Sequence, residues 1–179
     1  MPLTEEQETI LRRAIRRPLW DHGTATRPVG MGRPEIERLI PHRAPLLLVD
    51  RITAVDPGQH ALEGKRRISP DDPVFQGHFP GQPVYPGMFL LEMMGQFGLC
   101  LYRIEKVHTA IEEADAADLS NVRLFRVLSS LFAAPVLPRD ELTVRVLLLE
   151  ESGPTFSFAG QVSRGETVCA VGLMEVYRG

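Results

Sequence analysis

Residues 77–96 read GHFPGQPVYPGMFLLEMMGQ and pass from a loop dense in glycine and proline into an apolar segment. Pro86 suits the first turn of a helix, because the missing N–H costs no hydrogen bond there. From Met88 to Leu101 the chain is apolar apart from Glu92 and Gln96. We therefore predict one long helix over residues 86–107, apolar on nearly every side and surrounded by the rest of the protein.

Strand patterns lie on both sides of this predicted helix. Upstream, two runs with strand character read PLLLVDRITAVD and HALEGKRRIS, and a turn signal with proline and glycine separates them. Downstream, similar patterns cover residues 121–128, 142–150, 155–162 and the final run TVCAVGLMEVYR. One buried helix with several antiparallel strands predicts an α+β fold in which the sheet wraps over the helix.

The 179 residues suit a single domain with an extension in front of it. The extension is predicted over residues 1–33, with a short amphipathic helix over 4–17 and a glycine- and proline-rich linker over 21–34. Thr4 can open a capping box for this helix. Its run of arginines is typical of a solvated face, and a docking element for an acidic partner is the second interpretation. The main domain is predicted over residues 34–179.

Composition excludes several classes of protein. Hydrophobic residues make up 44%, charged residues 24%, and the formal net charge is −3, so no basic excess indicates a nucleic-acid partner. Cys100 and Cys169 lie in apolar runs and are expected to be buried thiols rather than metal ligands or a disulfide. The longest apolar segment is too short and too polar for a membrane span. We expect a cytoplasmic protein without a targeting segment.

The loop and the helix carry the groups that an α,β-elimination on a thioester needs. His78 can act as a base near neutral pH. The backbone N–H of Gly87, at the positive end of the helix, can stabilise a carbonyl oxygen that gains negative charge. Apolar neighbours should raise the pKa of Glu92, so that it can act as an acid, and Gln96 at i+4 can orient its carboxyl group. Supporting residues that stiffen the loop beside the histidine are Phe79, Pro80 and Gly81.

This stretch resembles the active-site motif of the (3R)-hydroxyacyl-acyl-carrier-protein dehydratases, the FabA/FabZ hotdog family, and the glutamate on the helix is typical of the FabZ type. The resemblance extends upstream through IERLIPHRAPLLLVDRI and downstream through APVLPRDEL, where Arg139 stands at a position that is usually glycine. It implies a hotdog fold, an antiparallel sheet wrapped around one long central helix. It also implies dehydration of (3R)-hydroxyacyl thioesters to trans-2-enoyl thioesters in type II fatty-acid or polyketide biosynthesis.

The resemblance further implies a dimer in which His78 of one chain faces Glu92 of the other, with the Gly87 N–H on the thioester carbonyl. A homodimer, a trimer of dimers or a heterodimer with a related hotdog subunit would each provide this arrangement. The acyl chain would enter an apolar tunnel lined by Phe89, Met93 and Phe97. The resemblance implies no cofactor or metal, and it implies that the substrate arrives on the phosphopantetheine of an acyl carrier protein. Candidate docking residues for that acidic carrier are Arg103, Lys106, Arg123, Arg126 and Arg139.

Three departures from the family pattern leave the substrate open. Tyr85 stands where the family usually has methionine, the helix segment MFLLEMMGQFG replaces a more alanine-rich one, and the extension before Pro34 is unusual. A specialised pathway, such as a type II polyketide or polyene system, is therefore an alternative. A hotdog thioesterase and a dehydratase that also isomerises its product are alternatives among enzymes. A non-catalytic hotdog subunit that binds acyl chains or supports a partner is the alternative outside catalysis, although such subunits usually lose the histidine or the acid.

Overall fold

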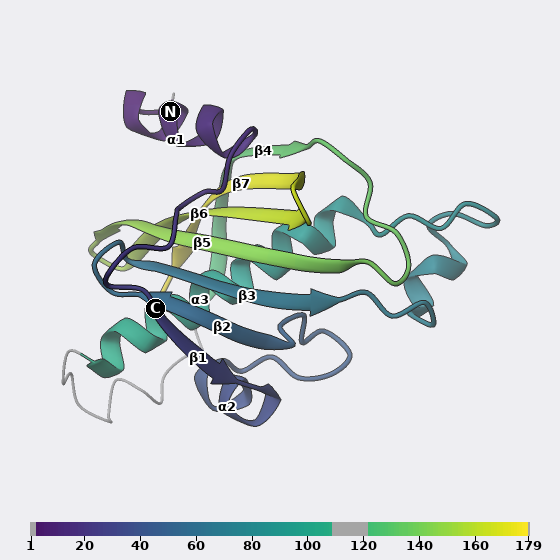
Figure 1. The fold of residues 1–179 in the computed structure, drawn as a ribbon, viewed down its shortest axis with the longest axis horizontal. Helices are drawn as coiled ribbons and strands as arrows, with labels where there is room; N and C mark the ends of the chain where they lie inside the picture. The colour runs from purple at the N-terminus through teal and green to yellow at the C-terminus, as the bar shows by residue number, and fades with distance from the viewer. Residues whose placement is uncertain (1–2, 109–121, 179) are drawn as a thin grey trace.

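The computed structural model describes residues 3–108 and 122–178 (Figure 1). Three helices, seven strands and one short 3-10 turn are found in this part of the chain. In chain order these are α1 (Glu5–Ala14), β1 (Arg27–Met31), α2 (Arg33–Leu39), β2 (Arg51–Asp56), β3 (Ala61–Arg67), the 3-10 turn η1 (Pro73–Gln76), α3 (Gly87–His108), β4 (Arg123–Phe132), β5 (Glu141–Ser152), β6 (Thr155–Arg164) and β7 (Thr167–Tyr177).

The strands form a single sheet in the order β1-β2-β3-β5-β6-β7-β4, and every neighbouring pair is antiparallel. Helix α3 crosses one face of this sheet and contacts β3, β5, β6 and β7 (Figure 1). This is the hotdog arrangement, an antiparallel sheet wrapped around one long helix, and the α+β prediction is confirmed. The helix predicted over residues 86–107 is present as α3.

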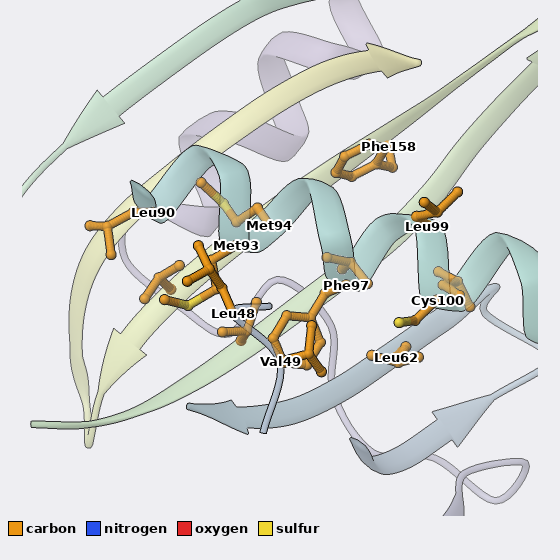
Figure 2. Packing of buried hydrophobic residues seen from close by; sticks show 14 of the residues in the cluster. Leu48, Val49, Leu62, Leu90, Met93, Met94, Phe97, Leu99, Cys100 and Phe158 are labelled. Atoms are coloured by element: carbon orange, nitrogen blue, oxygen red, sulfur yellow. The ribbon is translucent and has the colours of Figure 1, made fainter. Parts of the chain in front are cut away.

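Glycines in the sheet let α3 lie close to the strands. A Cβ atom on Gly64 would lie 2.4 Å from the ring of Phe97, and one on Gly160 would lie 2.7 Å from the sulfur of Met94. Neither contact leaves room for a methyl group, so the helix packs against bare backbone at both points. Figure 2 shows Met94 and Phe97 among the buried side chains that α3 contributes to the core, with Leu62 of β3 below Cys100.

The N-terminal segment packs on the opposite face of the sheet. Because Gly160 faces α3, its neighbour Gln161 points to the outer face of β6. There the Gln161 side chain accepts a hydrogen bond from the N–H of Leu19 at 3.0 Å and donates to the carbonyl oxygens of Ala14 at 2.6 Å and Arg17 at 2.8 Å. A second apolar cluster surrounds this amide: Ala14, Leu19, Trp20, Ala54, Ala61, Ala159, Val171 and Leu173.

Helix α1 begins as the sequence predicts, with Thr4 at its N-cap and a reciprocal capping box with Gln7. The structure differs from the prediction at residues 27–31, where we expected a linker and find β1, paired antiparallel with β2. Proline and glycine in this segment are typical of linkers, but an edge strand also tolerates them because one side of its backbone needs no ladder partner. The prediction of residues 1–33 as a separate extension stays a prediction.

No helix in the described part of the chain is both long enough and apolar enough to cross a membrane.

Arg139 has a left-handed backbone, with φ at 74°, in the turn before β5. This conformation costs a non-glycine residue about 1–2 kcal/mol. Glycine avoids that cost but loses more conformational entropy on folding, which cancels part of the gain. We therefore expect Arg139→Gly to raise the free energy of unfolding by about 0.5–1 kcal/mol, measured by urea denaturation. The reverse substitution, Gly165→Arg, should lower the free energy of unfolding, because φ at Gly165 is 55° and no atom lies within 4 Å of an added Cβ that could compensate by packing. Loss of stability in Arg139→Gly would contradict this account.

Candidate active site

The loop that carries His78 is held by its own backbone. The N–H of His78 donates to the carbonyl of Val74 at 3.0 Å, and its carbonyl accepts from the N–H of Val84 at 2.9 Å. Between these points Phe79 and Gln82 exchange two hydrogen bonds, at 3.2 and 3.0 Å. The turn between them contains a glycine with φ at 78°, a conformation that L side chains rarely adopt. The backbone of the histidine is thus fixed at both ends.

The imidazole of His78 is oriented by one further hydrogen bond. Its Nδ1 lies 2.8 Å from the carbonyl oxygen of Val84. A carbonyl can only accept, so Nδ1 carries the hydrogen and Nε2 is left with a free lone pair in the neutral ring. The ring of Phe79 stacks on the imidazole with a centroid distance of 4.0 Å. The arrangement prepares Nε2 to accept a proton.

A pocket of about 470 Å³ opens beside His78 at the start of α3. Gly87 is the first residue of α3, where backbone N–H groups have no partner within the helix and the positive end of the helix dipole lies. A Cβ on Gly87 would lie 2.9 Å from the ring of Phe132, so only glycine admits β4 at this distance. Apolar side chains supply most of the remaining lining, among them Val84, Met88, Leu90, Phe132 and Val136. The pocket therefore combines an imidazole and the N-terminal end of a helix with apolar walls.

Glu92 lies on a different side of α3 and is not part of the lining of this pocket. Its Oε1 accepts a hydrogen bond of 2.8 Å from Nε2 of Gln96, the contact that the i, i+4 spacing predicts. The same oxygen lies 3.4 Å from Nε2 of His42. Within this chain the structure thus brings His78 together with Gly87, and Glu92 together with Gln96 and His42.

The pKa of Glu92 is lowered from its ordinary value, mainly by the hydrogen bond from His42. Burial acts in the opposite direction, and the hydrogen bond from Gln96 and the charge of His42 lower the pKa further. The sequence prediction of a raised pKa is therefore wrong for this chain. Sequence reasoning missed His42 because it lies 50 positions before Glu92; its only signal was the PHRAP segment within the family resemblance.

The predicted tunnel residues lie mainly inside the protein. Met93 and Phe97 are fully buried in the core, as Figure 2 shows, and neither lines the pocket beside His78. Phe89 is partly buried and lies 5.7 Å from the ring of Tyr85, which does line that pocket. The assignment of Phe89, Met93 and Phe97 to an acyl tunnel stays a prediction.

The predicted docking residues lie in different surroundings. Arg103 is only 6% exposed, so the structure places it inside rather than on an entrance rim. Lys106 pairs with Glu151, and Arg126 pairs with Glu175. Arg123 lies over the ring of Tyr177, and Arg139 is exposed in its turn. The burial of Arg103 speaks against a docking role for this residue, and the docking role of the other four stays a prediction.

The fold and the pocket define a hotdog protein in which His78 lies in a loop beside the N-terminal end of the central helix. A FabA-like domain matches residues 40–171. The chain is 34% identical over 138 residues to the 3-hydroxyacyl-[acyl-carrier-protein] dehydratase FabZ of Campylobacter curvus, covering 76% of this chain and 89% of that protein. It is 38% identical over 142 residues to FabZ of Mannheimia succiniciproducens, covering 78% and 88%. The chain therefore belongs to the FabA-like family.

Among solved structures, the dehydratase heterocomplex ApeI:P from Xenorhabdus doucetiae has a similar fold. Its TM-score is 0.65 at 22% identity, over 80% of this chain and 90% of that one. This likeness supports the hotdog architecture.

Proposed function

We propose that this protein is a hydro-lyase that removes water from 3-hydroxyacyl thioesters carried on an acyl carrier protein, giving trans-2-enoyl thioesters. The observation that carries the proposal is the geometry of His78, whose Nδ1 is tied to Val84 while the ring lines a pocket that begins at Gly87. The FabZ relatives, named as dehydratases of this substrate class, give the reaction its substrate. Fatty-acid biosynthesis is the pathway that those relatives favour.

The reaction follows from the groups at hand. Nε2 of His78 takes a proton from the carbon next to the thioester carbonyl, while the N–H of Gly87 stabilises the negative charge on the carbonyl oxygen. The electron pair then forms the C=C bond as the C–O bond to the 3-hydroxyl breaks. Glu92 gives its proton to the departing oxygen, which leaves as water. Exchange with solvent returns one proton to Glu92 and removes one from His78.

A second copy of the chain supplies Glu92 in this proposal. Strand β4 ends the sheet and pairs only with β7 among the described strands, so its other backbone edge is open. Its large apolar side chains are 39% to 55% exposed, a surface that pairing with another subunit would cover: Leu124, Phe125, Val127, Leu131 and Phe132. Assembly and substrate binding would also remove water from Glu92 and raise its pKa toward that of a useful acid.

The remaining assignments follow from the chemistry. A base, an oxyanion donor and an acid complete the elimination, so we propose that the enzyme acts without a cofactor on a substrate held by phosphopantetheine. We propose a homodimer. A trimer of such dimers and a heterodimer with a related hotdog subunit are the alternative assemblies. Carrier-dependent synthesis places the enzyme in the cytoplasm in this proposal. Tyr85, buried beside the pocket, leaves a polyketide substrate as the second choice of acyl chain.

Mass spectrometry of 3-hydroxyacyl chains on purified carrier protein tests this function directly. The proposal expects loss of one water from the carrier-bound chain, with the thioester retained. Release of free carrier thiol without an enoyl product would instead identify a thioesterase. An unchanged 3-hydroxyacyl carrier across a series of chain lengths would favour a non-catalytic subunit.

A further inference from the structure

His42 lies in a loop that is fixed to two helices. On one side the guanidinium of Arg43 donates to the carbonyl oxygens of Glu37, Ile40 and His42 at 2.8 to 2.9 Å, which ties the loop to the end of α2. On the other side Gln96 of α3 donates to the carbonyl of Leu46 and accepts from the N–H of Leu48, both at 2.7 Å. These contacts hold the imidazole over α3.

The ring of His42 has one nitrogen on Glu92 and the other in the protein. Nε2 lies 3.4 Å from Oε1 of Glu92. Nδ1 is buried and has no hydrogen-bond partner among the described residues, so an N–H on this nitrogen would be unpaired. A hydrogen on Nε2, by contrast, points to the Glu92 carboxylate as its acceptor.

Both polar contacts that described side chains make with the Glu92 carboxylate fall on one oxygen. Gln96 and His42 each approach Oε1, which leaves Oε2 as the atom that can reach a substrate. Gln96 comes from the same helix, one turn away, and restrains the carboxylate from one direction only. His42 comes from a different element, so the pair fixes the plane of the carboxylate.

We infer that His42 is a positioning residue, which holds Oε1 of Glu92 so that Oε2 is presented to the 3-hydroxyl of the substrate. The inference rests on the proposed function, because it assigns His42 a task within that reaction. Of the titratable groups in the described residues, His42 is the one that lowers the pKa of Glu92, so it also stabilises the carboxylate that remains after proton donation. A group that acts in this way contributes to the rate rather than to substrate binding.

Replacement of His42 by alanine tests this role in the full-length protein. We expect kcat for water loss to fall by about 10–100-fold, since small misplacements of a catalytic group have effects of this size, while KM changes by less than about twofold. The limb of the pH–rate profile that reports Glu92 should move to higher pH, because the hydrogen bond that lowers its pKa is gone. His42→Gln, whose amide can still donate, should recover part of kcat.

A double-mutant cycle separates positioning from general damage. In a Glu92→Gln background, His42→Ala should cause no further loss, because its effect passes through the carboxylate. His60→Asn is the matched control: His60 also pairs with a glutamate, Glu105 at 3.0 Å, but it lies in the β2–β3 turn and its loss should leave kcat unchanged.

The outcomes distinguish the two claims. Inactive wild-type protein would overturn the proposed function and this inference with it. Active wild type with an inactive Glu92→Gln and an unaffected His42→Ala would overturn only the inference. Additive losses in the double mutant, or an equal loss in His60→Asn, would also overturn it.

Discussion

Replacement of His78 by alanine is expected to lower kcat for water loss by about 10²–10⁴-fold, the usual contribution of a general base. His78 lines the pocket, and the hydrogen bond from Nδ1 to Val84 sets the tautomer in which Nε2 is free. Alanine removes the base but leaves the backbone bonds of the loop in place, so substrate binding should change far less than the rate. The measurement is steady-state dehydration of a carrier-bound 3-hydroxyacyl chain.

His22→Ala supplies the control for this change. His22 contacts Glu63 at 3.5 Å and stacks on Trp20 in the N-terminal segment, a region that contributes nothing to the lining of the pocket. Its loss should leave kcat within about twofold of wild type, as for most substitutions away from a site. If His78→Ala dehydrates as fast as wild type, the base lies elsewhere and the mechanism proposed above is wrong.

Mixing two inactive variants is expected to restore activity. In the proposed dimer each site takes His78 from one subunit and Glu92 from the other, so a heterodimer of His78→Ala with Glu92→Gln contains one intact site. Random exchange of subunits in equal amounts would make half of the dimers mixed, and the sample should reach about a quarter of wild-type activity. The assay is the same dehydration reaction after co-refolding of the two chains.

The matched control is each inactive variant refolded alone, which should stay inactive. Recovery should also rise with the time allowed for subunit exchange and fall when one variant is in large excess. No recovery in a sample shown by native mass spectrometry to contain mixed dimers would place His78 and Glu92 of the same chain in one site. That result would remove the need for a second subunit.

Local patterns predicted much of the fold. Apolar residues on nearly every side of α3 indicated a helix surrounded by protein, and strand patterns located every strand of the sheet except β1. The i, i+4 spacing predicted the hydrogen bond between Glu92 and Gln96, which the structure shows at 2.8 Å. Each of these features depends on neighbours within one helix or one strand, where geometry follows directly from sequence.

Contacts between distant segments account for what the sequence could not predict. The low pKa of Glu92 depends on His42, 50 positions earlier, and no periodicity relates a loop to a helix across that distance. Arg103 was expected at the surface because arginine usually lies there, yet the fold places it inside at 6% exposure. Residues 27–31 became a strand because the edge of β2 was available to pair with them.

The side-chain amide of Gln161 connects two segments that the ribosome synthesises many seconds apart. It binds the N–H of Leu19, a residue 142 positions earlier. At ribosomal rates of about 5–20 residues per second, Gln161 emerges roughly 7–30 s after Leu19. During that interval Ala14, Leu19 and Trp20 lack the part of their cluster that β6 and β7 supply, namely Ala159, Val171 and Leu173. The outer face therefore closes late in biosynthesis, and a nascent chain stalled before β6 exposes these residues to chaperones and to aggregation.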